Sequence, residues 1–344
     1  MRFPEFINKT MDGGDCIGFV APSFGCAIEP YYSAFQNTLE NFKKRGIQTK
    51  LGSNVYAGDG IGISSTPEKC AKEFMDMYLD SEVDALISCG GGELMCEILP
   101  FLDFDRLKKS DPKWFMGYSD NTNLTFLLTT LADTASIYGP CAAAFGMEPW
   151  HPAIEDAFLL LNGKKLTMTN YPLWEKESRK DEEHPLEPYH VTEPFHVVTN
   201  IEGNISVSGR LVGGCLDCLS NLVGTRFDRV SDFSKQYKED GILWFLESCD
   251  LNVMDIRRSL WNLREAGWFD NASGFLIGRP MHYQEPTMGL DQYEAVKGVL
   301  SSFDVPIIMD LDIGHLAPMM PLICGSYATA VVNNGQFQIQ MELL

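Results

Sequence analysis

Short apolar runs alternate with segments of helical spacing in the first half of the chain. The runs at 15–21, 85–88 and 114–116 are short and mostly apolar, as strands buried in a parallel sheet are. The segments 30–45 and 66–78 carry their apolar residues on one face, as a helix packed on a sheet does. This alternation predicts an α/β fold with helices on both faces of a parallel sheet. Ligands of such sheets bind at the carboxyl ends of the strands.

One of these strand ends carries a serine. The run 114–116 leads directly into Gly117-Tyr118-Ser119-Asp120, and leucines recur at helical spacing after it. A serine on a sharp strand-to-helix turn projects from the sheet beside the first N–H groups of a helix. That position suits a nucleophile and the oxyanion that its attack generates. Serine is also a favoured N-cap residue, so this segment alone equally allows Ser119 to be a helix cap.

The charge of the chain argues against two classes of partner. Its 344 residues have a formal net charge of −20 and no Lys/Arg-rich run, whereas binding to nucleic acid or to an anionic membrane depends on Lys and Arg. No apolar run approaches the ~20 residues that span a bilayer, and the first residues lack the basic-then-apolar pattern of a secretory signal. We therefore expect a cytoplasmic protein that binds neither nucleic acid nor membrane.

The ten cysteines are scattered along the chain, and reduced thiols are expected in a long intracellular protein. Cys215 and Cys218 form the one Cys-x-x-Cys motif. A zinc site would need a second pair of ligands, and no other Cys or His pair has ligand spacing. A redox role for the two cysteines stays open. We expect no bound metal.

The composition and periodicity of the sequence change between residues 166 and 204. The stretch 174–183 is highly charged, prolines recur, and helical periodicity is lost. This pattern predicts a connecting segment that is partly ordered at best, and a lid over the site is the alternative. Short strand-like runs and one helix at 255–266 follow it. We therefore expect domains at 1–165 and 205–344, joined by a connector at 166–204.

A serine nucleophile needs a base within hydrogen-bond reach and a carboxylate that orients the base. Among the six histidines, His315 lies in a Gly- and Pro-flanked loop after the apolar run 307–309, and His282 also follows a strand. Glu247 ends the apolar run 242–246, and such a carboxylate needs a partner if it is buried.

Two of these assignments have simpler alternatives. Glu247 could cap a helix, or pair with Arg257 or Arg258. The Gly90-Gly91-Gly92 turn directly follows a predicted strand, so its backbone can approach a ligand closely. It lacks the dinucleotide-binding and P-loop patterns. An oxyanion hole beside Ser119 fits its position better than a phosphate site, and a simple tight turn stays open.

Together these motifs resemble the LD-carboxypeptidase family of serine peptidases, which includes muramoyl-tetrapeptide carboxypeptidases and the microcin C immunity peptidase MccF. The resemblance covers nearly the whole chain. The motifs that carry it are Gly90-Gly91, Gly117-Tyr118-Ser119-Asp120, Gly213-Gly214-Cys215-Leu216, Phe245-Leu246-Glu247, and Gly314-His315 with Pro318 and Pro321. One departure is Cys215, where the family commonly has Asn.

The resemblance implies a role for each candidate residue. Ser119 is the nucleophile, His315 the general base and Glu247 its orienter, while the backbone N–H groups of Gly91 and Asp120 form the oxyanion hole. It also implies a flavodoxin-like N-terminal domain and a smaller, swivelling β/α C-terminal domain. Family members are typically dimers without metal or cofactor, so we expect a homodimer.

The substrate is less constrained than the site. An MccF-like amidase would cleave a small peptide or a peptidyl- or aminoacyl-nucleotide, and the long connector with Trp174 slightly favours this branch. The alternative is a muramoyl-tetrapeptide LD-carboxypeptidase of murein recycling. Two other classes are a non-catalytic ligand-binding module and a reductase, but a pure binder needs no Glu247–His315 pair, and the cofactor fingerprint is absent.

Overall fold

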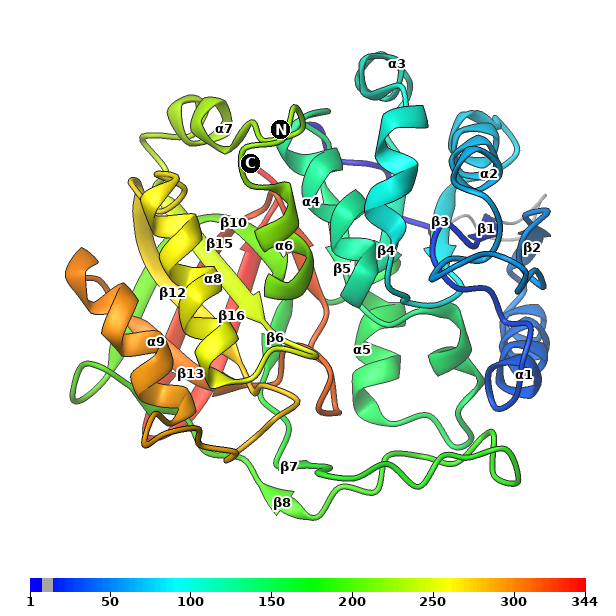
Figure 1. Ribbon diagram of the computed structural model, residues 1–344. Helices are drawn as coiled ribbons and strands as arrows, with labels where there is room; N and C mark the ends of the chain where they lie inside the picture. The colour runs from blue at the N-terminus through cyan, green and yellow to red at the C-terminus, as the bar shows by residue number, and fades with distance from the viewer. Residues whose placement is uncertain (8–14) are drawn as a thin grey trace.

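The computed structural model describes residues 1–7 and 15–344, and the chain forms an α/β fold with two mixed sheets (Figure 1). The first sheet has six strands, in the spatial order β14 (Leu322–Cys324), β5 (Ser136–Tyr138), β4 (Trp114–Gly117), β3 (Ala85–Ser88), β1 (Cys16–Val20) and β2 (Gln48–Leu51). The five strands from the first half are parallel. Their order, 2-1-3-4-5, is that of flavodoxin-like sheets.

The first sheet is not wholly parallel, which corrects the prediction. Strand β14 comes from the second half of the chain and pairs antiparallel with β5. It lies seven residues beyond His315 in the sequence, so the chain that carries this histidine returns to the edge of the first sheet.

The second sheet has eight strands. Their order is β6 (Thr167–Thr169), β16 (Gln336–Glu342), β15 (Tyr327–Asn333), β10 (Ile205–Cys215), β11 (Ile242–Glu247), β12 (Ala272–Gly278), β13 (Ile307–Leu311) and β9 (Val198–Thr199). Strands β10 to β13 are parallel, and the outer pairs are antiparallel. Strand β10 begins directly after the connector and has 11 residues.

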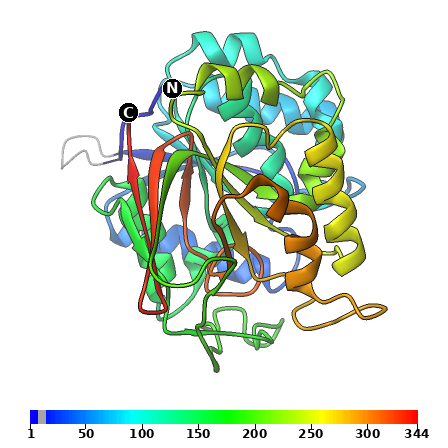
Figure 2. The ribbon, with the colours of Figure 1, turned by 90° about the vertical axis from the view of Figure 1, so that its left-hand side faces the viewer.

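The expected connector at 166–204 contains four short strands. Strands β6 and β9 are the two edges of the eight-stranded sheet. Between them, β7 (Leu173–Trp174) and β8 (Glu193–Pro194) form a two-stranded ribbon at one end of the molecule (Figures 1 and 2). Residues 175–192, between β7 and β8, form no helix or strand. The segment is therefore paired with the eight-stranded sheet at its two ends and irregular in its middle.

Helices cover the sheets, and several begin where the sequence predicts. The α-helices are α1 (Tyr31–Lys44), α2 (Pro67–Leu79), α3 (Phe104–Lys109), α4 (Thr122–Thr130), α5 (Pro152–Leu161), α6 (Leu216–Leu222), α7 (Val230–Gln236), α8 (Val253–Glu265) and α9 (Gln292–Leu300). The 3-10 helices are η1 (Met95–Phe101), η2 (Ser119–Asn121), η3 (Ala142–Gly146) and η4 (Ser301–Phe303). Pro67 is the first residue of α2, the position at which a helix tolerates proline.

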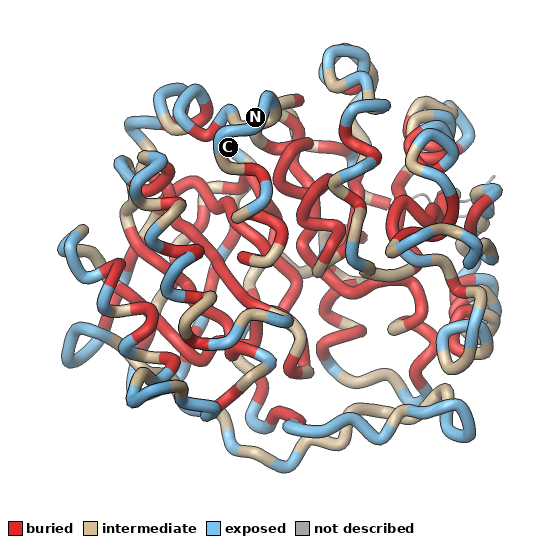
Figure 3. Tube along the Cα trace, viewed as in Figure 1, coloured by how far each residue is buried: buried red, intermediate tan, exposed pale blue. Residues whose placement is uncertain are grey.

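The two sheets share one apolar core. Its largest cluster joins Ile17 and Phe19 of the first sheet to Phe245 and Leu276 of the second. The ring of Tyr138, at the end of β5, lies 5.2 Å from that of Phe245 on β11. Figure 3 shows buried residues throughout both sheets and exposed ones on the outer faces of the helices. Among the described residues, no helix has the length and apolar character needed to cross a membrane.

Candidate active site

Ser119, His315 and Glu247, which are far apart in the sequence, lie in hydrogen-bond contact. His315 Nε2 is 2.9 Å from Ser119 Oγ, and His315 Nδ1 is 2.8 Å from Glu247 Oε2. Ser119 follows β4 of the first sheet, whereas Glu247 ends β11 of the second sheet and His315 follows β13. An imidazole between a hydroxyl and a carboxylate is the arrangement that activates a serine nucleophile.

Ser119 occupies a strained turn. Its φ of +63° lies in the left-handed region, which costs a non-glycine residue about 1–3 kcal/mol and is common at functional sites. The turn joins β4 to η2 and α4. The Ser119 side chain caps neither η2 nor α4, since their N-cap residues are Tyr118 and Asn121. The alternative that Ser119 serves as a helix cap is therefore wrong, and its hydroxyl faces His315 instead.

Glu247 is buried and contacts neither arginine proposed as its alternative partner. Arg258 pairs with Asp255, and Arg257 reaches the backbone of α9. The backbone at Gly314 packs directly on the carboxylate, because a Cβ at Gly314 would lie 2.5 Å from Glu247 Oε2. The φ of Gly314 is +107°, which also favours glycine. The glycine before His315 thus lets the loop close over Glu247.

The ion pair shifts both pKa values. Burial alone would raise the pKa of Glu247, but attraction to His315 and hydrogen bonds from His315, Tyr138 and Cys215 lower it below its ordinary value. Burial alone would lower the pKa of His315. Attraction to the Glu247 carboxylate, together with hydrogen bonds to Cys249 and Glu247, outweighs burial and raises the pKa of His315 well above 6.5. The resting pair is therefore ionised near neutral pH.

The glycine turn lies against the serine. A Cβ at Gly91 would be 3.0 Å from Ser119 Cβ and 3.1 Å from Ser119 Oγ. Asn121 Nδ2 donates to Gly90 O at 2.8 Å, which ties this turn to the segment that follows Ser119. Asp120 is the second residue of η2, where the first N–H groups have no partner within the helix. The two residues expected at the oxyanion hole thus flank the serine.

The Asp120 side chain is held below this turn. It accepts hydrogen bonds from Ser23 Oγ at 2.6 Å and from the Met95 N–H at 2.9 Å. Burial raises the pKa of Asp120 to about 6, although these hydrogen bonds oppose the rise. Its carboxylate is therefore a structural anchor for the turn, while its backbone remains beside Ser119.

Two family models match this chain in order. The LD-carboxypeptidase N-terminal domain matches residues 17–139, and the LD-carboxypeptidase C-terminal domain matches residues 208–330. The chain belongs to the LD-carboxypeptidase family. The resemblance found in its short motifs is thereby confirmed, and membership makes this chain a hydrolase of a serine peptidase family.

Two relatives with different named functions have the same sequence identity to this chain. The microcin C7 self-immunity protein MccF of Escherichia coli is 26% identical over 96% of this chain and 94% of its own length. The "probable murein peptide carboxypeptidase" of Bacillus subtilis is also 26% identical, over 96% of this chain and 94% of that protein. Sequence identity alone does not separate the two.

Solved structures show the same fold. The MccF-like protein from Bacillus anthracis has a TM-score of 0.84 at 22% identity, and the match covers 100% of both chains. A structure of MccF in complex with glutamyl sulfamoyl guanosine has a TM-score of 0.78 at 22% identity, over 99% of this chain and 100% of that chain. At these identities the likeness concerns the fold alone.

The remaining residues that the sequence offered as candidates, a histidine and two cysteines, are not part of the Ser119–His315–Glu247 contact. His282 contacts Glu285 at 2.8 Å in an exposed loop and is not brought to Ser119. Cys215 and Cys218 are free, buried thiols. Cys218 Sγ lies 3.6 Å from Ser119 O. No group of three or more potential metal ligands occurs within residues 1–7 and 15–344.

Glu247 also contacts Tyr138, a residue of the first half of the chain that the sequence analysis did not name as a candidate. Tyr138 ends β5, a three-residue strand that was not predicted, and its hydroxyl donates to Glu247 Oε1 at 2.5 Å. The signal that could have found it is the Gly139-Pro140 turn after a short apolar run. This strand end lies beside that of Ser119, as the pairing of Gly117 with Tyr138 shows.

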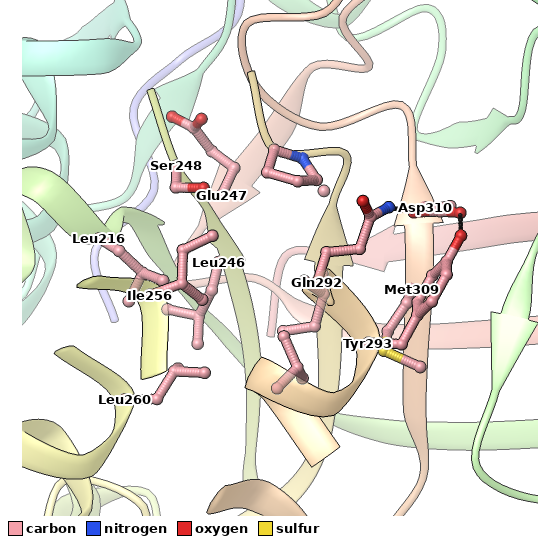
Figure 4. Close-up of a pocket in the computed structure, with 14 residues that line it drawn as sticks. Leu216, Leu246, Glu247, Ser248, Ile256, Leu260, Gln292, Tyr293, Met309 and Asp310 are labelled. Carbon is pink, nitrogen blue, oxygen red and sulfur yellow. Dashed lines mark hydrogen bonds between the residues drawn. The ribbon is translucent and has the colours of Figure 1, made fainter. Parts of the chain in front are cut away.

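An apolar pocket lies behind Glu247, between strands β11–β13 and helices α8 and α9 (Figure 4). Leu246, Ile256 and Leu260 line it, while Ser119 and His315 do not. In Figure 4 the Glu247 carboxylate points away from these apolar side chains. The pocket therefore lies on the far side of Glu247 from the serine, which sets it apart from the reacting groups.

Proposed function

We propose that this chain hydrolyses an amide bond as a serine carboxypeptidase or amidase, with Ser119 as nucleophile, His315 as general base and Glu247 as the residue that orients His315. The observation that carries the proposal is the pair of hydrogen bonds at His315, 2.9 Å to Ser119 Oγ and 2.8 Å to Glu247 Oε2. No other histidine in the described residues has a carboxylate on one side and a serine hydroxyl on the other.

The reaction then proceeds through an acyl-enzyme. Ser119 Oγ attacks the carbonyl carbon, and its proton passes to His315 Nε2. The tetrahedral intermediate collapses when the C–N bond breaks, and the leaving amine takes the proton from His315. Water next attacks the ester, gives its proton to His315, and releases the acid product. Ser119 recovers its proton from His315.

Backbone N–H groups stabilise the intermediate in this proposal. Those of Gly91 and Asp120 donate to the oxyanion, and losing one such donor typically costs ~10²–10³ in rate. The close approach of Gly91 to Ser119 supports this role, because a side chain at residue 91 would fill the space that the substrate carbonyl needs. No metal or cofactor takes part.

An MccF-like substrate, a small peptide or an aminoacyl-nucleotide, is our first choice. MccF, which matches over nearly its whole length, has been solved with glutamyl sulfamoyl guanosine. Trp174 does not support this choice as a base-stacking platform. It is only 2% exposed and packs on Tyr283 and Leu316. The alternative, a murein tetrapeptide, is favoured by the equally similar relative in Bacillus subtilis.

Replacing the nucleophile tests the reaction class. Ser119→Ala should reduce kcat at least ~10³-fold with the fold intact, because it removes the hydroxyl that lies 2.9 Å from His315 Nε2. Ser302→Ala, at an exposed residue of η4, is the matched control and should keep full activity. Hydrolysis by Ser119→Ala at the wild-type rate would contradict a serine mechanism, and ligand binding without any hydrolysis by the wild type would favour a binding module.

Product analysis with two substrates tests the choice between the branches. The purified protein would be given a murein tetrapeptide and, separately, an aminoacyl sulfamoyl adenosine. We expect the amide of the second to be cleaved. Cleavage of the tetrapeptide alone would favour the murein alternative. The homodimer implied by the family stays a prediction, for which light scattering of the same preparation gives the mass.

A further inference from the structure

The Tyr138 hydroxyl hydrogen-bonds to two residues of the proposed catalytic site, Glu247 and Ser119. It donates to Glu247 Oε1 at 2.5 Å, and it accepts a hydrogen bond from the Ser119 N–H at 3.3 Å. The residue is fully buried at the end of β5. A phenol that bonds both the orienting carboxylate and the backbone of the nucleophile is placed to fix the distance between them.

Both oxygens of Glu247 are thereby occupied. His315 takes Oε2 and Tyr138 takes Oε1. A buried carboxylate with an unpaired oxygen can rotate or take up a proton, because burial disfavours the charged form. Burial and the neighbouring Glu247 charge raise the pKa of Tyr138 well above 10. The phenol therefore stays protonated and acts as a donor throughout the working pH range.

The contact also joins the two sheets. Tyr138 belongs to β5 of the six-stranded sheet, next to Gly117 of β4, whereas Glu247 belongs to β11 of the eight-stranded sheet. Ser119 and Glu247 thus come from different sheets, and the side chain of Tyr138, like that of His315, hydrogen-bonds to both. A change in the spacing of the sheets would break this contact before it altered either strand.

We propose that Tyr138 is a positioning residue for proton transfer, which aims the Glu247 carboxylate at His315 and holds it in register with the Ser119 turn. This inference rests on the proposed function, because it requires the triad to be catalytic. A purely structural hydrogen bond would stabilise the fold without affecting the titration of the triad, whereas a positioning residue would affect it.

The pH profile separates these two roles. Without the hydroxyl, the ionised carboxylate loses a hydrogen bond, so the Glu247–His315 pair takes up its proton at a higher pH. The acid limb of the kcat profile should therefore move up by about one pH unit. The titratable groups that face this pair are Tyr118, Tyr138, Cys215, Asp217, Cys218 and Cys249. All except Tyr138 are unchanged in the variant.

The test compares Tyr138→Phe with Tyr78→Phe. The control also removes a buried hydroxyl that accepts one backbone N–H, that of Lys113 at 3.1 Å, but it lies among α2 residues away from the triad. With the substrate that the wild type hydrolyses, Tyr138→Phe should lower kcat about ten- to a hundredfold, leave KM within about twofold, and shift the acid limb upward. Tyr78→Phe should leave the pH profile unchanged.

A second variant covers the case in which Tyr138→Phe does not fold. A fluorinated tyrosine at residue 138 keeps the ring and the hydroxyl but is a stronger donor, so the acid limb should move to lower pH. A double mutant with Glu247→Ala adds a further check, since the effect of Tyr138→Phe should vanish when the carboxylate is absent.

Several outcomes would overturn the inference. They are an acid limb that moves in neither variant, one that moves equally in Tyr78→Phe, and a Tyr138→Phe effect that persists in the Glu247→Ala background. Each would apply to an enzyme that Ser119→Ala inactivates. If Ser119→Ala stays active, the proposed function itself fails, whatever the Tyr138 variants do.

Discussion

At the scale of single residues, the contact between Gly91 and Ser119 makes the most direct prediction. In Gly91→Ala the new Cβ would lie 3.0 Å from Ser119 Cβ and 3.1 Å from its hydroxyl oxygen, so the hydroxyl should be displaced from His315. We expect kcat to fall about ten- to a hundredfold. The free energy of unfolding should change by no more than about 1 kcal/mol, as measured by denaturant titration.

The control for this substitution is Gly58→Ala. A Cβ at Gly58 would meet only the Ala27 side chain, at 3.1 Å, and the residue is exposed. Its activity should match that of the wild type. Full activity in Gly91→Ala would show that a Cβ at residue 91 does not displace the Ser119 hydroxyl. The close approach of Gly91 to Ser119 would then no longer support an oxyanion hole at Gly91.

The His315 pair predicts the pH dependence of the reaction. His315 must be neutral to accept the Ser119 proton, and the Glu247 carboxylate raises the pKa of His315 well above 6.5. Activity should therefore rise as the pH increases through this raised pKa, so the acid limb of kcat/KM should lie above pH 6.5. Glu247→Gln removes the charge and should move that limb down by at least about one unit.

In the same variant kcat should fall by roughly 10³–10⁴-fold, since the imidazole loses the group that orients it. A pH–rate profile of both proteins provides the measurement. An acid limb at the ordinary histidine pKa in the wild type would contradict an ionised pair at rest.

At the scale of elements, local periodicity explains what the sequence could predict. Strands β1, β3 and β4 are apolar runs bounded by turns, and α1 and α2 have one apolar face, so each signal lies within the element itself. Strand β5 has three residues, which is too short for any period. Strands β6 and β9 are ordered by partners far along the chain, and no local pattern encodes such pairing.

The residues of the candidate site could also be predicted only where a signal lies in the local sequence. Ser119, Glu247 and His315 each lie at or after the end of an apolar run, which made them candidates, and the family resemblance implied their roles. Tyr138 was missed because its strand was missed. The contacts that join these residues depend on how the two sheets pack, and packing between sheets has no signature in a single sequence.

The β7–β8 ribbon predicts a role for segment 166–204 in holding the histidine loop. Trp174 is 2% exposed and packs in a small cluster with Leu316, next to His315. The Glu175 N–H donates to Ala317 O at 2.7 Å. Trp174→Ala should therefore loosen this loop and lower kcat about tenfold, whereas Trp174→Phe keeps a ring in place and should retain most activity.

Trp261→Ala is the control for this prediction. Trp261 is 53% exposed on α8, so removing it should change neither kcat nor the profile with pH. Steady-state kinetics of the three variants is the measurement. Equal activity in Trp174→Ala and the wild type would mean that the ribbon does not support the His315 loop.

At the scale of the whole molecule, we predict that the expected boundaries at 165 and 204 do not separate two independently folding units. Strand β14 supplies an edge of the first sheet from beyond His315, and its Leu322 and Ile323 are fully buried. A fragment of residues 1–165 would expose the edge of β5 and part of the shared core. We expect it to lack a cooperative unfolding transition.

Co-expression with residues 166–344 should restore the transition and the activity, because the missing strand and the core are then supplied in trans. Near-ultraviolet circular dichroism during thermal unfolding is the measurement. A fragment 1–165 that unfolds cooperatively by itself would show that β14 contributes little, and would favour the simpler division into two domains.

The separation of the triad along the chain also has a consequence for synthesis. Ser119 and His315 are 196 residues apart, and ribosomes add about 5–20 residues per second. Roughly 10–40 s therefore pass between the synthesis of Ser119 and that of His315, its general base in the proposed mechanism. A half-translated chain can fold its first strands, but it cannot hydrolyse anything. Activity would begin only after His315 has been synthesised and its loop has folded against Ser119.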